Sequence, residues 1–258
     1  MIAFVREVAG SLARCELTHL ARKPIDVPRA RGQHARYVAE LAAAGCRIEW
    51  LPPLPEHADG VFVEDTAVLV PEVAVITRPG VASRRPETES VAAALAGRVQ
   101  VRRISAPGCL EGGDVLRIGR TLYVGQATGG RSNPAGVAQL GEALEPFGYT
   151  VRSVALRGCL HLKSACTFLP PQTLLVNPAW VDPAAFGAGA VIAVDPQEPS
   201  GANTLTVAGL TLVSAAYPRT RERLDAAGIA TRALDVSEVH KAEAALTCMS
   251  LLVEERAD

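Results

Sequence analysis

The sequence predicts an α/β fold made of about five repeated units, each with the order strand, strand, helix, strand. Three observations lead to this fold class. Five β-rich segments share one form, in which a polar residue or two precede an apolar run. Four of them continue through a short turn into a second run, as a β-hairpin does. Between the hairpins lie stretches whose apolar residues recur at helical spacing.

The hairpins recur at a nearly constant step along the chain. Measured between equivalent polar residues, the steps are 47, 50, 42 and 45 residues. A repeat of this size indicates one supersecondary unit that either stacks beside its copies or closes into a ring. The segments are VFVEDTAVLVPEVAVITRP, CLEGGDVLRIGRTLYVG, CLHLKSACTFLPPQTLLVNP, GANTLTVAGLTLVSAA and LTCMSLLVEE, measured from Glu64, Glu111, His161, Asn203 and Cys248.

Helices are predicted between the hairpins from their punctuation and periodicity. Pro86 begins one helix, and Asn133 with Pro134 begins another, because proline is favoured in the first turn of a helix. Two further helices are expected over residues 33–45 and 218–228, each ending at a glycine suited to a left-handed cap. The opening MIAFVREV is expected to donate the first strand of the series.

Length and composition bound the function. Apolar residues make up 48% of the 258 residues and charged residues 21%, which is typical of a globular protein. No linker divides the chain, so we expect one domain. A net charge of −1 gives no basic footprint for nucleic acid or an anionic membrane, so we expect a small ligand. The opening segment is too short for a signal peptide and no apolar run could span a membrane, which predicts a cytoplasmic location.

The six cysteines are scattered and form no CxxC pair. This spacing indicates neither a disulfide framework nor a zinc site, so we expect free thiols and no metal. Five of the cysteines are interpreted as core or surface thiols: Cys15, Cys46, Cys109, Cys159 and Cys166. Cys248 is either a sixth buried thiol, the commoner case for a cysteine taken alone, or a nucleophile whose partners lie far upstream.

A closed ring would bring the polar starts of the hairpins together around one axis. It would gather Glu64, Asp65, Glu111, His161 and Cys248 in a single cleft. Because side chains alternate along a strand, the period of two predicts that these starts present every second residue to one face. The sets expected on one face are Leu246, Cys248 and Ser250, and His161, Lys163 and Ala165.

These residue types suit chemistry on a cationic substrate. An imidazole near a thiol favours the thiolate, and His161 is the natural partner of Cys248. Three carboxylates at the same level oppose thiolate formation in an empty site, but they match the planar donors of a guanidinium ion. Taken alone, the acidic pair of FVED could equally be a solvated turn, and EGGD a tight start to a hairpin.

Arginines near the same hairpins predict a site for an anionic group. Arg84 and Arg85 follow the first hairpin, and Arg131 follows the second, where they could hold a carboxylate away from the acidic groups. Each could also belong to an exposed basic patch. A ligand with a guanidinium at one end and a carboxylate at the other is an arginine-like amino acid.

Taken together, these segments resemble the dimethylarginine dimethylaminohydrolases of the guanidine-modifying pentein superfamily. The strings that carry the resemblance are FVEDTAV, SRRPETE, APGCLEGGD, LHLKSA, YPRTRE and SEVHKAEAALTCMSL, in this order over most of the chain. The resemblance implies a five-bladed α/β propeller of ββαβ units with pseudo-fivefold symmetry, formed by residues 1–258 as a single catalytic domain. It also implies hydrolysis of methylated arginine to citrulline and a methylamine without metal or cofactor.

The resemblance also implies roles for individual residues. It implies a covalent thiouronium intermediate on Cys248, with His161 as general acid and base and Glu111 as the orienting carboxylate. A segment beginning after Leu17, THLARKPIDVPRARGQ, corresponds to a mobile lid, and Ser132 stands where the family more usually has threonine. The residues implied to bind the substrate are Glu64 and Asp65 at the guanidinium, Arg84 and Arg131 at the carboxylate, and Asp59 and the Leu17 carbonyl at the α-amine.

Two kinds of alternative remain open. An arginine deiminase, or a hydrolase of another small guanidine, would use the same thiol, imidazole and carboxylates. A binding protein on the same ring, such as the ribosome anti-association factors, would need none of these groups at equivalent positions. The expected partner is therefore a small-molecule guanidine rather than nucleic acid or membrane, and the chain is expected to be a monomer or a homodimer.

Overall fold

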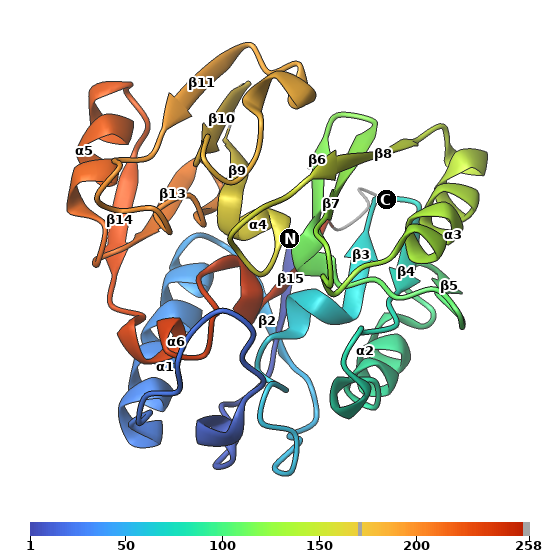
Figure 1. Ribbon diagram of the computed structural model, residues 1–258. Helices are drawn as coiled ribbons and strands as arrows, with labels where there is room; N and C mark the ends of the chain where they lie inside the picture. Colours follow the sequence, from blue (N-terminus) through green and yellow to red (C-terminus); the bar gives the residue numbers. More distant parts are fainter. Residues whose placement is uncertain (170–171, 255–258) are drawn as a thin grey trace.

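Five small sheets of the same design succeed one another along the chain (Figure 1). The computed structural model describes residues 1–169 and 172–254. Each sheet has three strands, of which the first and second pair antiparallel and the second and third pair parallel. In hydrogen-bonded order the sheets are β15 (Leu251–Val253), β1 (Ile2–Val5) and β2 (Arg47–Trp50); β3 (Ala67–Leu69), β4 (Val73–Ile76) and β5 (Gln100–Arg103); β6 (Val115–Ile118), β7 (Thr121–Gln126) and β8 (Thr150–Ala155); β9 (Cys166–Leu169), β10 (Thr173–Val176) and β11 (Ala190–Ala193); and β12 (Leu205–Val207), β13 (Leu210–Ser214) and β14 (Thr231–Leu234).

Each parallel pair is joined by a crossover on the outside of the molecule, as parallel strands require. Figure 1 shows these crossover helices at the periphery, around the strands. The crossovers are α1 (Val27–Ala43), α2 (Glu87–Leu95), α3 (Pro134–Leu144), the 3₁₀ turn η6 (Pro183–Phe186) and α5 (Pro218–Ala226). The predicted five-bladed propeller of ββαβ units is therefore confirmed.

The ring closes through the last strand of the chain. β15 pairs antiparallel with β1, with Val253 opposite Ile2, so the two ends of the chain share one sheet. MIAFVREV was expected to donate the first strand of the series, but it forms the middle strand of its sheet, between β15 and β2. Middle strands such as β1 and β4 are buried along their whole length, whereas the third strands β2 and β5 are exposed at both ends.

The predicted helices are present, with one shifted start. Asn133 accepts a hydrogen bond from the Gly136 N–H and caps α3. The helix expected from residue 33 already begins at Val27, because Asp26 caps it by accepting from the Arg29 N–H at 3.0 Å. The first turns of this helix were missed from the sequence because they are rich in arginine and lack the helical spacing of apolar residues seen after residue 33. The turn of the third hairpin includes residues 170 and 171, which lie outside the described residues.

Short helical turns, rather than strands, stand at the starts of four hairpins. They are η2 (Val63–Thr66), η4 (Gly112–Asp114), α4 (Leu162–Ala165) and η7 (Thr247–Met249). The period of two expected for LTCMSLL and LHLKSA is therefore wrong, because residues 247–249 form a 3₁₀ turn and residues 162–165 an α-helical turn. η2 packs against both η4 and η7, and η4 packs against α4, so the predicted convergence is confirmed. Within the described parts of the chain, no helix has the length and apolar character needed to cross a membrane.

Candidate active site

Three buried ionisable side chains meet where η2, η4 and α4 converge. The Nε2 atom of His161 lies 2.8 Å from Oε2 of Glu111, and its Nδ1 lies 3.9 Å from Oδ1 of Asp65. His161 and Glu111 are the residues immediately before α4 and η4, and Asp65 lies within η2. The polar starts of three different hairpins thus form one acid–imidazole–acid cluster.

The carboxylates of this cluster keep the imidazole charged. Burial lowers the pKa of His161, but the negative charges of Asp65, Asp114 and Glu111 outweigh it and raise this pKa to about 9. Burial likewise opposes ionisation of Asp65, yet the positive charges of His161 and Arg84 lower its pKa to about 2. Burial raises the pKa of Glu111, but its hydrogen bond to His161 and the positive charges of His161 and Arg84 together lower this pKa below the ordinary value. At neutral pH the cluster is therefore an imidazolium between two carboxylates.

The same three groups have the residue types of a metal site. One ligand atom from each of Asp65, Glu111 and His161 lies within 4.8 Å of the others. A metal ion would bind neutral imidazole and so compete with a proton whose pKa is about 9. The hydrogen bond and the raised pKa are those of a charged acid–base pair.

Asp114 and Ser132 support the cluster through hydrogen bonds to the backbone of Leu162 and Glu111. Neither was identified from the sequence as a site residue. Asp114 accepts from the Leu162 N–H at 3.2 Å and from the Ser132 hydroxyl at 2.6 Å, while Ser132 Oγ accepts from the Glu111 N–H at 3.1 Å. Burial raises the pKa of Asp114 to about 6. Asp114 ends the EGGD string, and Ser132 follows Arg131, so both lay beside residues already singled out.

The two glycines of EGGD are required by the close approach of the hairpin starts. A Cβ on Gly112 would lie 2.0 Å from the carbonyl oxygen of Glu64. A Cβ on Gly113 would lie 2.7 Å from Nδ1 of His161 and 2.8 Å from Oδ1 of Asp65. The Gly113 N–H also donates to Asp65 at 3.0 Å. EGGD is thus a contact surface between repeats and does more than begin a hairpin.

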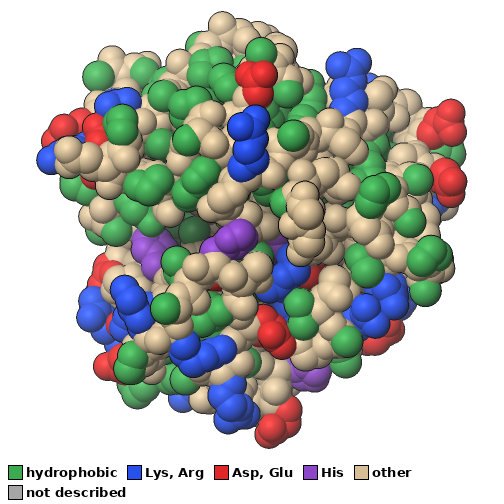
Figure 2. All heavy atoms as spheres, in the orientation of Figure 1, with side chains coloured by type: hydrophobic (Ala, Val, Ile, Leu, Met, Phe, Trp, Pro, Cys, Tyr) green, Lys and Arg blue, Asp and Glu red, His purple; other side chains and the backbone are tan. Residues whose placement is uncertain are grey.

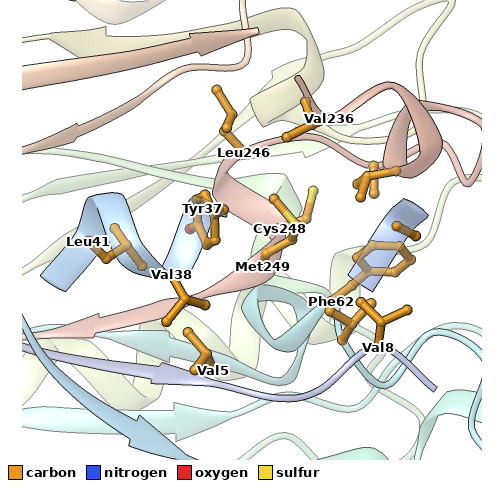
Figure 3. Close-up of a cluster of buried hydrophobic side chains, with 14 of the residues drawn as sticks. Val5, Val8, Tyr37, Val38, Leu41, Phe62, Val236, Leu246, Cys248 and Met249 are labelled. Carbon is orange, nitrogen blue, oxygen red and sulfur yellow. The ribbon is translucent and has the colours of Figure 1, made fainter. Parts of the chain in front are cut away.

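Cys248 lies in η7 at the edge of a buried hydrophobic cluster. Figure 3 shows it beside Met249, with Tyr37 and Leu246 close by. Its sulfur accepts a hydrogen bond from the Ala245 N–H at 3.4 Å. Burial, and then the charges of Glu64 and Asp65, raise the pKa of the thiol. The thiol is therefore neutral at pH 7.

Glu64 joins η7, the turn that carries Cys248, to α4 at the start of the third hairpin. Its carboxylate accepts from Lys163 Nζ at 2.7 Å and from the Thr247 hydroxyl at 2.7 Å. Asn203 accepts from the Thr247 N–H at 3.1 Å and donates to the Thr247 hydroxyl at 3.0 Å. Thr247 and Asn203 were missed as site residues, although Asn203 occupies the equivalent position of the fourth hairpin in the sequence repeat.

Arg84 is fully enclosed by acidic groups in this structure. It contacts Asp65 at 2.6 Å and Glu87 at 3.0 Å, and it donates to the Phe62 carbonyl at 3.1 Å. Burial disfavours its charge, but Glu87 and Asp65 raise its pKa well above the ordinary value. Burial raises the pKa of Glu87, the less well compensated of the two acids. The structure thus pairs Arg84 with Asp65, one of the two acids expected at the guanidinium, rather than placing it away from the acidic groups.

The remaining predicted residues lie around the segment that follows the 3₁₀ turn η1 (Leu12–Arg14). Arg131 lies 3.7 Å from Glu111 and donates to the Thr18 hydroxyl at 2.8 Å. Asp59 accepts from the N–H of Glu16 at 3.1 Å, next to Leu17, and burial raises its pKa. Residues 27–33 of the expected lid form the first turns of α1, so its irregular part ends at Asp26.

A groove leads from the surface to the thiol. Its volume is about 750 Å³. It runs between residues 19–23, α6 (Ser237–His240) and residues from 158–164 and 199–203, with Cys248 in its wall. On the face drawn in Figure 2, histidine side chains lie beside a hollow near the middle of the surface. A small ligand can reach Cys248 by this route.

Two curated proteins similar to this chain share one description. It is 40% identical to an N(G),N(G)-dimethylarginine dimethylaminohydrolase of Streptomyces coelicolor, over 99% of this chain and 98% of the relative. It is 35% identical to the enzyme of the same name from Pseudomonas aeruginosa, over 91% of both chains. No protein-family model matches the chain.

Solved structures with the same fold carry ligands of the expected kind. A cysteine-to-serine variant of the Pseudomonas aeruginosa enzyme, complexed with citrulline, superposes with a TM-score of 0.90 at 33% identity, over 96% of this chain and 97% of that one. A histidine-to-glycine variant of a dimethylarginine dimethylaminohydrolase, as an adduct with S-methyl-L-thiocitrulline, gives 0.89 at 33% identity, over 96% and 98%. The N-terminal domain of a cyanobacterial arginine dihydrolase, at 20% identity and a TM-score of 0.85 over 98% and 97%, shares the fold.

Replacing Gly113 by alanine tests the packing of the cluster. The new Cβ would lie within 2.8 Å of both His161 and Asp65, so one of them must move. We expect the pKa of His161, followed by NMR titration, to fall from about 9 toward the ordinary value of about 6.5. Gly32→Ala, on α1 with no atom within 4 Å of the new Cβ, should leave it unchanged. A folded Gly113→Ala variant with an unchanged His161 pKa would contradict this geometry.

The raised pKa of His161 also predicts how stability depends on pH. Because the folded pKa of about 9 lies above the unfolded value of about 6.5, the stabilisation is fully present below about pH 6.5 and is lost as the pH rises through 9. The melting temperature of the wild type should therefore fall more between pH 6.5 and 9.5 than that of His161→Gln. Equal falls in the two proteins would show that His161 does not carry the charge assigned to it.

Proposed function

Because the chain belongs to the dimethylarginine dimethylaminohydrolase family, we propose that it hydrolyses Nω-methylated arginine to citrulline and a methylamine. The observation that carries the proposal is the buried imidazolium between Asp65 and Glu111, in a ring that also holds the Cys248 thiol beside Glu64. This arrangement offers an acid, a nucleophile and a binding site for a cation. The reaction breaks one C–N bond of a guanidine.

The proposed substrate site has two ends. One end carries only carboxylates, and the other combines an arginine with a carboxylate and a backbone carbonyl. Glu64 and Asp65 hold the guanidinium, for which planar, bidentate pairing with carboxylates is favourable. Arg131, which reaches from Glu111 to Thr18, takes the substrate carboxylate, and Asp59 lies beside the segment that presents the Leu17 carbonyl to the α-amine. Arg84 is assigned to the same carboxylate by the resemblance. To reach it, this side chain has to give up part of its pairing with Asp65 and Glu87.

The positive charge of the substrate favours ionisation of the Cys248 thiol in the proposed mechanism. In the free site, burial and two carboxylates favour the neutral thiol. A guanidinium placed between Glu64 and Asp65 adds a positive charge near the sulfur, which lowers the pKa of Cys248 and releases its proton to solvent. The thiolate then attacks the guanidinium carbon and forms a C–S bond. Stabilisation comes from carboxylates around a cationic centre, so an oxyanion hole is not needed.

His161 supplies and then removes protons. Its pKa of about 9 means that the imidazolium is ready to protonate the departing methylamine, after which the C–N bond breaks and a thiouronium adduct remains on Cys248. The neutral imidazole then takes a proton from water, and the hydroxide adds to the same carbon. Breaking the C–S bond restores the thiolate, and the proton of the added hydroxyl leaves to solvent, which gives neutral citrulline. Glu111 holds the ring through Nε2 during both proton transfers.

Arginine deiminase activity, or hydrolysis of another small guanidine, is the alternative within the same chemistry. A fold shared with an arginine dihydrolase at 20% identity does not favour it over the family activity. Citrulline formation from dimethylarginine, monomethylarginine and arginine, measured in parallel, separates the candidates. Faster turnover of arginine than of either methylarginine would overturn the preference for methylated substrates.

The wider context of the enzyme follows as part of the same proposal. The ring closure by β15 and β1, and the even repeats without a linker, support a single catalytic domain over residues 1–258. A small-molecule guanidine is the partner, and the mechanism needs no metal or organic cofactor. A cytoplasmic location and a monomeric or homodimeric state remain predictions.

Removing either proposed catalytic side chain should abolish turnover without unfolding the protein. We expect Cys248→Ser and His161→Gly to lower kcat for dimethylarginine at least about 1000-fold, because each removes a group that reacts directly. Circular dichroism should show an intact fold. Cys46→Ser is the matched control, because Cys46 is a buried thiol to which no role is assigned. This variant should retain turnover. Citrulline production near the wild-type rate in either catalytic variant would refute the assignment.

A further inference from the structure

Glu243 makes an unusual set of contacts between two distant segments. It lies between α6 and η7, five residues before Cys248. Its carboxylate accepts hydrogen bonds from three successive backbone N–H groups: Thr18 at 2.9 Å, His19 at 2.5 Å, and Leu20. Successive N–H groups that converge in this way form a concave binding site for an anion, here filled by a side chain of the same protein.

The backbone of Glu243 is itself held in an uncommon conformation. Its φ is 55°, in the left-handed region that residues other than glycine rarely adopt. The neighbouring Lys241 donates to the Pro24 carbonyl at 3.1 Å, and Glu238 accepts from the Asp26 N–H at 2.8 Å. Residues 238–243 are thus hydrogen bonded to both ends and the middle of the irregular stretch from Thr18 to Asp26. The segment that precedes Cys248 in the chain therefore fixes the position of residues 18–26.

The geometry of one peptide unit gives this anchor a consequence for substrate binding. The N–H of Thr18 and the C=O of Leu17 belong to the same planar trans peptide, so they point in opposite directions. When Glu243 accepts from the Thr18 N–H, it fixes the direction of the Leu17 carbonyl. The same short stretch is tied to Arg131 by the Thr18 hydroxyl at 2.8 Å and to Asp59 by the Glu16 N–H at 3.1 Å.

We propose that Glu243 is a positioning residue, which orients the Leu17–Thr18 peptide so that the Leu17 carbonyl oxygen faces the α-ammonium group of the substrate. The inference rests on the proposed function, since that function assigns Leu17 to the α-amine. Glu243 does not touch the reacting atoms. It acts on the end of the substrate that undergoes no chemistry, where binding is the same in the ground state and the transition state.

Kinetics of Glu243 variants test the inference. Glu243→Ala frees the peptide to rotate, so KM for dimethylarginine should rise about tenfold, as for loss of one hydrogen bond to a charged group, while kcat changes less than about threefold. Glu243→Gln keeps one acceptor oxygen and should give an intermediate KM. If Glu243→Ala does not fold, the intermediate KM of Glu243→Gln carries the test.

A matched control separates positioning from general stabilisation. Glu198 also accepts from two successive backbone N–H groups, those of Arg219 at 3.0 Å and Thr220 at 2.7 Å, at the start of α5. Glu198→Ala should lower the melting temperature but leave KM unchanged. An equal rise in KM in the Glu198 and Glu243 variants would overturn the positioning role.

A substrate analogue without the α-amine gives the decisive comparison. Its inhibition constant against dimethylarginine hydrolysis should be the same for wild type and Glu243→Ala, because the group that the Leu17 carbonyl would bind is missing. The matching analogue with the amine should bind about tenfold more weakly to the variant. Equal weakening of both analogues would overturn the inference. Failure of the proposed function is distinct, since it would appear as absence of citrulline formation by the wild type.

Discussion

The structure depends on one electrostatic constraint, the balance of buried charge around the axis of the ring. Four carboxylates from two hairpin starts, Glu64, Asp65, Glu111 and Asp114, lie buried there. A buried carboxylate is costly unless it is paired or hydrogen bonded. Part of the pairing comes from a further repeat, from His161 just before α4 and Lys163 within it, whereas Arg84 follows β4 in the same repeat as Asp65. Packing of the repeats against one another therefore helps to make the acidic site tolerable, and the proposed reaction needs that acidic site.

In the proposed mechanism, the same balance explains why the nucleophile is ionised only when substrate binds. Each carboxylate proposed to attract a guanidinium also opposes ionisation of Cys248, which favours the neutral thiol in the free enzyme. The imidazolium of His161 is committed to Asp65 and Glu111, which raise its pKa to about 9 and keep its proton available for the departing amine. The acid is thus charged in advance, whereas the nucleophile is charged on binding. A neutral thiol also protects the enzyme from adventitious oxidation, since the thiolate is the reactive form.

The sequence predicted the ring and most of the cluster because both depend on spacing. A step of 42 to 50 residues placed Glu64, Glu111, His161 and Cys248 at equivalent positions, and equivalent positions in a ring face one axis. The local backbone was predicted wrongly at those starts, since polar residues in 3₁₀ and α-helical turns do not alternate. Contacts that span repeats, such as Thr247 with Glu64 and Asp114 with the Leu162 N–H, could not be read from the sequence. The contact of η4 with Glu64, Asp65 and His161 depends on the close backbone approach that Gly112 and Gly113 permit.

The most direct test of this account is a titration of the Cys248 thiol with and without a cationic ligand. Thiolate absorbance near 240 nm, roughly where thiolates absorb, is followed against pH for the wild type, with Cys248→Ser subtracted as the blank. We expect a pKa above the value of about 8.5 for a free thiol in the empty enzyme, and a fall in that pKa when a non-reactive guanidine is bound. A free-enzyme pKa well below 8.5 that does not change with ligand would contradict the central claim that the substrate supplies the missing charge.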